Sequence, residues 1–122
     1  MILITGGAYQ GKTAWAAENH KIQSFWDCAE KGFPARADCI LHMESFSKLC
    51  AEKGISSVEW LKENEDIWQN SILICRQIGS GVVPVLAKDR KWVEENGAML
   101  RFLSKEAKKV FRIFAGLAED LK

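Results

Sequence analysis

The sequence predicts an α/β fold: a three-layer sandwich in which a mostly parallel central sheet carries helices on both faces. Two observations predict it. Short, continuous apolar runs recur along the chain and end at glycine or polar residues, as strands buried on both faces do. Longer helix-favouring stretches separate these runs, and the alternation of strands with helices is typical of parallel sheets.

The individual elements follow from local patterns. Residues 1–5 form an apolar run that stops at a glycine pair, which predicts a buried strand, and alanines after Lys12 favour a helix ending near Asn19. Further strands are predicted at residues 39–43, 71–75 and 110–115, with a weaker one within residues 21–27. Helices are predicted at residues 45–53, from Ser56 or Ser57 to Trp68, and from Ala87 to Ala107 with an interruption at Asn96 and Gly97.

Length, charge and cysteine use limit the classes of function. A chain of 122 residues with 48% apolar residues can bury one core, so residues 1–122 are interpreted as a single domain. Seventeen basic and sixteen acidic side chains nearly cancel, which predicts neither nucleic acid nor a membrane surface as a partner. The sequence shows no membrane-spanning run and no signal peptide, and its four scattered cysteines are interpreted as free, buried thiols. We therefore expect a cytoplasmic protein.

A glycine-rich motif follows the first predicted strand. Gly6-x-x-x-x-Gly11-Lys12-Thr13 matches the phosphate-binding loop (P-loop) pattern G-x-x-x-x-G-K-[ST]. Glycines let the backbone turn its N–H groups toward phosphate oxygens, the lysine neutralises phosphate charge, and the threonine hydroxyl ligates Mg²⁺. We therefore expect a P-loop NTPase-like domain that binds ATP or GTP with Mg²⁺. The nucleotide-binding residues are predicted to be Gly6, Gly7, Ala8, Tyr9, Gln10, Gly11, Lys12 and Thr13, with Lys12 also acting in catalysis.

Such a site also needs an acidic residue at the end of a neighbouring strand, which holds Mg²⁺ directly or through water. Glu44 follows the strand predicted at residues 39–43 and is the candidate metal ligand together with Thr13. The alternative is that Glu44 is a solvated acid at the start of the next helix. His42 lies inside the predicted strand, so we interpret it as a structural histidine rather than a catalyst.

Two glycine-rich segments together carry a resemblance to a known family. Residues 1–13, MILITGGAYQGKT, are similar to a strand followed by G-G-A-R-S-G-K-S, and residues 72–84, ILICRQIGSGVVP, are similar to a strand followed by N-E-V-G-x-G-I-V-P. Over roughly residues 1–19 and 71–122 the chain resembles a shortened member of the adenosylcobinamide kinase/adenosylcobinamide-phosphate guanylyltransferase family of cobalamin biosynthesis. The resemblance implies Mg²⁺-dependent phosphoryl transfer to a corrinoid, adenosylcobinamide.

The sequence departs from that family's motifs at positions that bear on the chemistry. Tyr9 and Gln10 stand in place of Arg-Ser, and Arg76 and Gln77 stand in place of Asn-Glu. Residues 20–38 are too few to hold the family's segment with the histidine that accepts a guanylyl group, so guanylyl transfer is not expected. Two alternatives stay open: a catalytically degenerate nucleotide-binding regulatory protein, and a P-loop kinase for another small molecule.

Two further expectations concern surfaces. Five tryptophans are many for this length, and we expect a homo-oligomer in which a partner subunit covers some of them. The glycine-rich segment at residues 79–84 either closes over the substrate or a neighbouring subunit, or is a connector between a strand and a helix.

Overall fold

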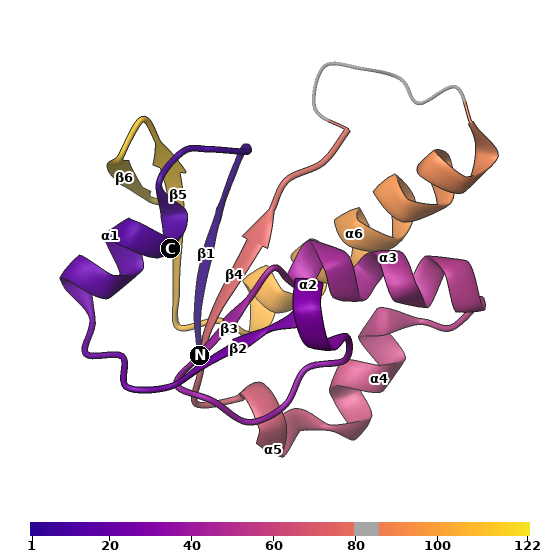
Figure 1. Cartoon of the computed structure of the whole chain (residues 1–122), viewed down its shortest axis with the longest axis horizontal. Coiled ribbons are helices and arrows are strands. Elements are labelled where there is room, and N and C mark those ends of the chain that lie inside the picture. Colours follow the sequence, from indigo (N-terminus) through magenta and orange to yellow (C-terminus); the bar gives the residue numbers. More distant parts are fainter. Residues whose placement is uncertain (80–85) are drawn as a thin grey trace.

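The computed structural model describes residues 1–79 and 86–122, which form an α/β fold around a six-stranded sheet (Figure 1). The strand order is β2-β3-β4-β1-β5-β6; strands β1 to β5 run parallel, and β6 is antiparallel to β5. In chain order the elements are β1 (Ile2–Gly6), α1 (Lys12–Asn19), β2 (Phe25–Asp27), α2 (Cys28–Lys31), β3 (Cys39–Leu41), α3 (Met43–Lys53), α4 (Ser57–Glu63), α5 (Glu65–Trp68), β4 (Ile72–Arg76), α6 (Ala87–Glu106), β5 (Lys109–Phe114) and β6 (Leu117–Asp120).

Helices cover both faces of the sheet, as Figure 1 shows for α1 on one side and α3, α4 and α6 on the other. Successive residues of a strand point to opposite faces. On β1, Ile4 accordingly packs in the cluster that contains Ala16 of α1. The adjacent Leu3 packs in the larger cluster, together with Phe46 of α3 and Leu103 of α6. Burial on both faces explains why the central strands are continuous apolar runs.

The predicted α/β class and mostly parallel sheet are confirmed, with differences in individual elements. The interruption expected at Asn96 and Gly97 is wrong, because both residues lie inside the continuous helix α6. Asn96 is 1% exposed and bonds to Ser47 Oγ at 2.8 Å and to the Arg76 carbonyl oxygen at 3.1 Å. We attribute the continuity of α6 to these tertiary bonds, which offset the low helix propensity of Asn and Gly, roughly 1 kcal/mol for Gly.

Other elements also differ from the predicted ones. The helix expected to run to Trp68 is divided at Asn64 into α4 and α5, although its cap is confirmed: Ser56 Oγ accepts the Glu59 N–H at 3.2 Å. Strand β6 was not expected, because all four of its side chains are exposed and it has no apolar alternation. It forms because the turn at Ala115 and Gly116 folds it back onto β5, with both turn residues at positive φ.

All four cysteines are buried and free, as expected. Burial raises the pKa of the Cys28, Cys39 and Cys50 thiols to about 12, so they stay protonated at neutral pH. No helix in the described ranges is long and apolar enough to cross a membrane.

Candidate functional site

Strands β1 and β4 are neighbours in the sheet, but the helices that follow them lie on opposite faces. Helix α1, after β1, packs on one face, and α6, the next helix after β4, packs on the other. Such a pair leaves a crevice at the carboxyl ends of the strands, where ligands bind in open α/β sheets. A cavity of about 360 Å³ lies here, lined by residues 8–14 together with His42, Glu44, Ile74 and Arg76. The sequence motif therefore faces this crevice.

The segment between β1 and α1 is a tight turn that requires glycine at two positions. Gly6 has φ 146° and Gly11 has φ 85°, values that residues with a Cβ rarely adopt. A Cβ on Gly6 would lie 2.5 Å from the Ile113 carbonyl oxygen of β5, so the loop leaves the sheet in direct contact with the neighbouring strand. Tyr9 also has a positive φ, 58°, and its side chain is fully exposed at the tip.

Positive charge is concentrated inside this turn. Lys12 Nζ donates a hydrogen bond to the Gly7 carbonyl oxygen at 2.6 Å. Helix α1 starts at Lys12 with no acidic residue in its first turn and no side-chain cap, so the positive end of its dipole faces the cavity uncompensated. Burial lowers the pKa of Lys12, Glu44 opposes this effect, and Arg76 adds to it. The arrangement favours an anion.

Glu44 lies in the first turn of α3 and is 7% exposed. The expectation that it sits at the tip of the strand next to β1 is wrong, because β4 lies between β1 and β3. Its side chain reaches across the end of β4 instead, where Oε1 accepts the Arg76 N–H at 2.9 Å. Glu44 nevertheless lines the same cavity as Thr13, so the two predicted metal ligands are brought together.

The donor set at this position fits Mg²⁺ bound with a nucleotide. Across residues 1–79 and 86–122, no group of three or more His, Cys, Asp or Glu side chains could hold a metal ion by itself. Mg²⁺ at a phosphate site takes only one or two protein oxygens, since waters and phosphate oxygens complete its shell. The Thr13 hydroxyl and the Oε2 atom of Glu44, which bonds to no described residue, supply such oxygens.

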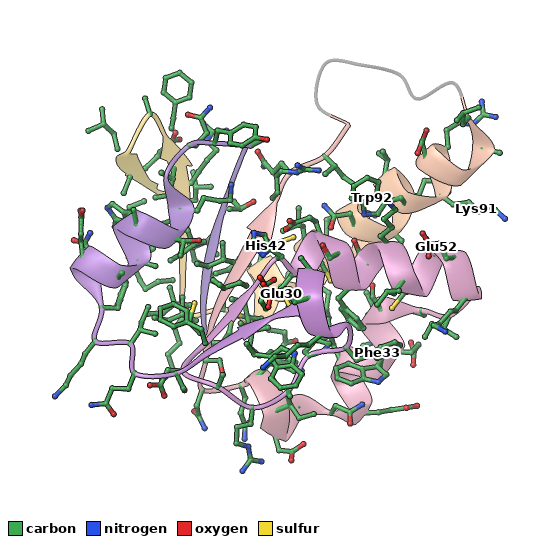
Figure 2. All side chains as sticks on the ribbon, viewed as in Figure 1. Glu30, Phe33, His42, Glu52, Lys91 and Trp92 are labelled. Carbon is green, nitrogen blue, oxygen red and sulfur yellow. The ribbon has the colours of Figure 1, made fainter. Side chains whose placement is uncertain are left out.

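His42 is not inside a strand, so the interpretation that placed it there is wrong. It follows the last residue of β3 and caps α3 with φ 57°, and its exposed side chain lines the cavity. Figure 2 shows it where β3 passes into α3. Its Nδ1 lies 2.7 Å from Asp27 Oδ1 at the end of β2. Burial alone would raise the pKa of Asp27, but hydrogen bonds from His42 and Ala29 outweigh this and lower it. Asp27 therefore stays ionised at neutral pH.

Two contributions to the site were missed by sequence reasoning. Arg76 lines the cavity, although in the sequence it was noted only as a departure from the family's motif and not as a site residue. Helix α6 supports the start of α3 from outside the cavity, because Trp92 Nε1 donates to the Glu44 carbonyl oxygen at 2.9 Å; Figure 2 labels Trp92 on α6. Both depend on the order of strands in the sheet, which local patterns do not determine.

The loop is also tied to the C-terminal hairpin. The Gly116 N–H donates to the Gln10 carbonyl oxygen at 3.0 Å, and the Ala115 N–H donates to the Gln10 side-chain oxygen at 2.6 Å. Gln10 therefore holds the turn between β5 and β6.

The expectation that residues 79–84 form either a closing loop or a connector concerns residues that, apart from Gly79, lie outside the described ranges. The sequence matches no family model, and no curated protein is significantly similar to it.

Proposed function

We propose that this chain is a P-loop nucleotide-binding enzyme that binds ATP or GTP with Mg²⁺ and transfers the γ-phosphoryl group to a hydroxyl of a small molecule. The observation that carries the proposal is the uncapped N-terminus of α1, which faces a cavity together with the glycine loop and Lys12. Backbone N–H groups and a helix dipole that converge on one point form a phosphate site.

Each part of the site has a role in this reaction. The backbone of residues 7–13 would cradle the β-phosphate, and Lys12 would neutralise charge on the β- and γ-phosphates. Thr13 and Glu44 would hold Mg²⁺, which when bound neutralises and orients the phosphates. Phosphoryl transfer depends mainly on positioning the reactants and neutralising their charge, and these groups are of the types that supply both.

For the acceptor we propose a corrinoid, adenosylcobinamide, on the basis of the sequence resemblance alone. The experiment has two steps: calorimetric binding of ATP and GTP with and without Mg²⁺, then incubation with γ-³²P-labelled nucleotide with and without adenosylcobinamide. Labelled corrinoid supports the whole proposal. Phosphoryl transfer or hydrolysis at a rate that adenosylcobinamide does not change indicates a kinase for another molecule. Nucleotide binding without turnover indicates a regulatory protein. A protein that binds neither triphosphate contradicts the proposal.

The Glu44→Gln variant is expected to raise the Mg²⁺ concentration for half-maximal triphosphate binding by about tenfold, since a carboxylate is a far better Mg²⁺ ligand than an amide. The amide oxygen can still accept the Arg76 N–H, so the fold should be kept. Glu52→Gln, an exposed position on the same helix (Figure 2), is the matched control. Unchanged Mg²⁺ dependence in Glu44→Gln would remove Glu44 from the metal site.

A homo-oligomer is also proposed, although the tryptophans do not require one. Trp68 is 2% exposed, and the other four are half-buried within the chain. The exposed apolar side chains at the loop and the adjoining hairpin are a better reason, because Tyr9, Phe114 and Leu117 are 103%, 71% and 74% exposed. Sedimentation at micromolar concentration should show a dimer or larger species that Leu117→Ser weakens. A monomer for the unmodified protein would contradict this.

A further inference from the structure

Arg76 is the second cationic side chain that lines the cavity beside the glycine loop. It is the last residue of β4, and its register partner on β1 is Gly6, the first residue of the motif. The residue is half-buried, and within residues 1–79 and 86–122 its guanidinium makes no hydrogen bond and no ion pair. A guanidinium has five N–H donors, which favour an anionic oxygen ligand when they are partly withdrawn from water.

The backbone of Arg76 is held on both sides, so its side chain starts from a fixed point. Its N–H donates to Glu44 Oε1 at 2.9 Å, and its carbonyl oxygen accepts from Asn96 Nδ2 at 3.1 Å. The next residue is held as well, because the Gln77 N–H donates to the Gly6 carbonyl oxygen at 2.9 Å. Because the backbone of Arg76 is already held, only its side chain has to become ordered when it meets a phosphate.

The charge of the cavity depends on Arg76. Lys12 and Glu44 line the cavity with opposite charges that offset each other, and Arg76 supplies the net positive charge that remains. The loop amides and the end of α1 suit the β-phosphate. The γ-phosphate, which a diphosphate lacks, would then lie farther into the crevice between β1 and β4, on the side of Arg76.

We propose that Arg76 binds the γ-phosphate and thereby makes this site select nucleoside triphosphates over diphosphates. The inference rests on the proposed nucleotide-binding function. A guanidinium forms paired N–H···O bonds with phosphate oxygens, and a diphosphate has no phosphate at the γ position to accept them. The same contact would favour release of the diphosphate after transfer, because the γ-phosphate is then gone.

The test compares dissociation constants for the β,γ-imido analogue of ATP and for ADP, both with Mg²⁺, in the unmodified protein, Arg76→Gln and Arg76→Lys. Arg76→Gln should weaken analogue binding by about 10- to 100-fold and ADP binding by less than about threefold. Arg76→Lys keeps the charge but not the paired geometry, so its loss for the analogue should be intermediate. Arg101→Gln, at an exposed position on α6, is the control and should change neither constant.

The outcomes separate this inference from the function on which it rests. If the unmodified protein binds neither nucleotide, both fall. If it binds the analogue but Arg76→Gln binds it equally well, or loses analogue and ADP to the same extent, only the role of Arg76 is overturned. Thermal melting shows whether Arg76→Gln is folded. If it is not folded, Arg76→Lys alone tests the role of Arg76. A preference of Arg76→Lys for the analogue over ADP equal to that of the unmodified protein would then overturn the paired contact.

Discussion

Replacing Lys12 with alanine is expected to weaken triphosphate binding by about 100-fold, at the upper end of the losses expected for the substitutions considered. The Lys12 ammonium lies inside the glycine turn, 2.6 Å from the Gly7 carbonyl oxygen, where a phosphate oxygen can replace that carbonyl as its partner. Charge-assisted contacts in a partly buried site contribute about 3 kcal/mol, which corresponds to roughly a hundredfold in the dissociation constant. Calorimetry with ATP and GTP measures the change.

The fold of Lys12→Ala should be at least as stable as that of the unmodified protein. Because burial lowers the pKa of Lys12, the unfolded chain holds this proton more tightly than the folded chain, and stability rises with pH between the two pKa values. At neutral pH the charge is therefore a cost to folding, which alanine removes. Lys21→Ala, an exposed lysine outside the cavity, is the control. Full triphosphate affinity in a folded Lys12→Ala would disprove the phosphate site.

Gly6→Ala is expected to destabilise the protein by about 3 kcal/mol or more, the largest effect on folding among the substitutions considered. The added Cβ would lie 2.5 Å from the Ile113 carbonyl oxygen, and this backbone atom cannot move aside easily because Ile113 is paired with Ala118 of β6 and follows directly on the residues of β5 that pair with β1. The φ of 146° at Gly6 adds strain for any residue with a Cβ. Thermal or urea unfolding followed by circular dichroism measures the loss.

Gly11→Ala is the matched control for this effect. Its φ of 85° also disfavours alanine, but the nearest atom to the added Cβ would be Gly116 Cα at 3.7 Å, an ordinary contact. We expect a loss of only about 1–2 kcal/mol, from backbone strain alone. If both variants lost the same stability, the close approach of Gly6 to β5 would not be the reason why residue 6 has to be glycine.

The fold was predictable where burial on both faces leaves a clear signal. Strands β1, β3 and β4 are mainly apolar runs, and these strands and β5 lie within the predicted segments or one residue from them. Predictions of element boundaries were wrong where tertiary contacts determine where an element begins or ends. Asn96 reads as a helix breaker until its partners on α3 and β4 are known. Helix α2 is four residues long and depends on the Asp27 cap, which is too local for a periodic pattern to show.

The candidate site divides in the same way. The loop from Gly6 to Thr13 is contiguous, so its motif and its chemistry are visible in the sequence. The other lining residues include Arg76 at the end of β4, His42 after β3 and Glu44 in the first turn of α3. Those residues come together because β4 is inserted between β1 and β3, and this order is set by long-range packing. The local sequence pattern of a strand does not determine which strands become its neighbours.

The hydrogen bonds between Gln10 and the turn at Ala115 and Gly116 have a consequence for synthesis. Strand β1 is made well before β5, yet in the sheet it lies between β4 and β5. The loop that follows β1 therefore lacks its contacts with β5 and with this turn until those residues have been made. A nascent chain can complete these contacts only after residue 116 has left the exit tunnel, so nucleotide should bind chains in which that residue is free of the tunnel and not shorter precursors.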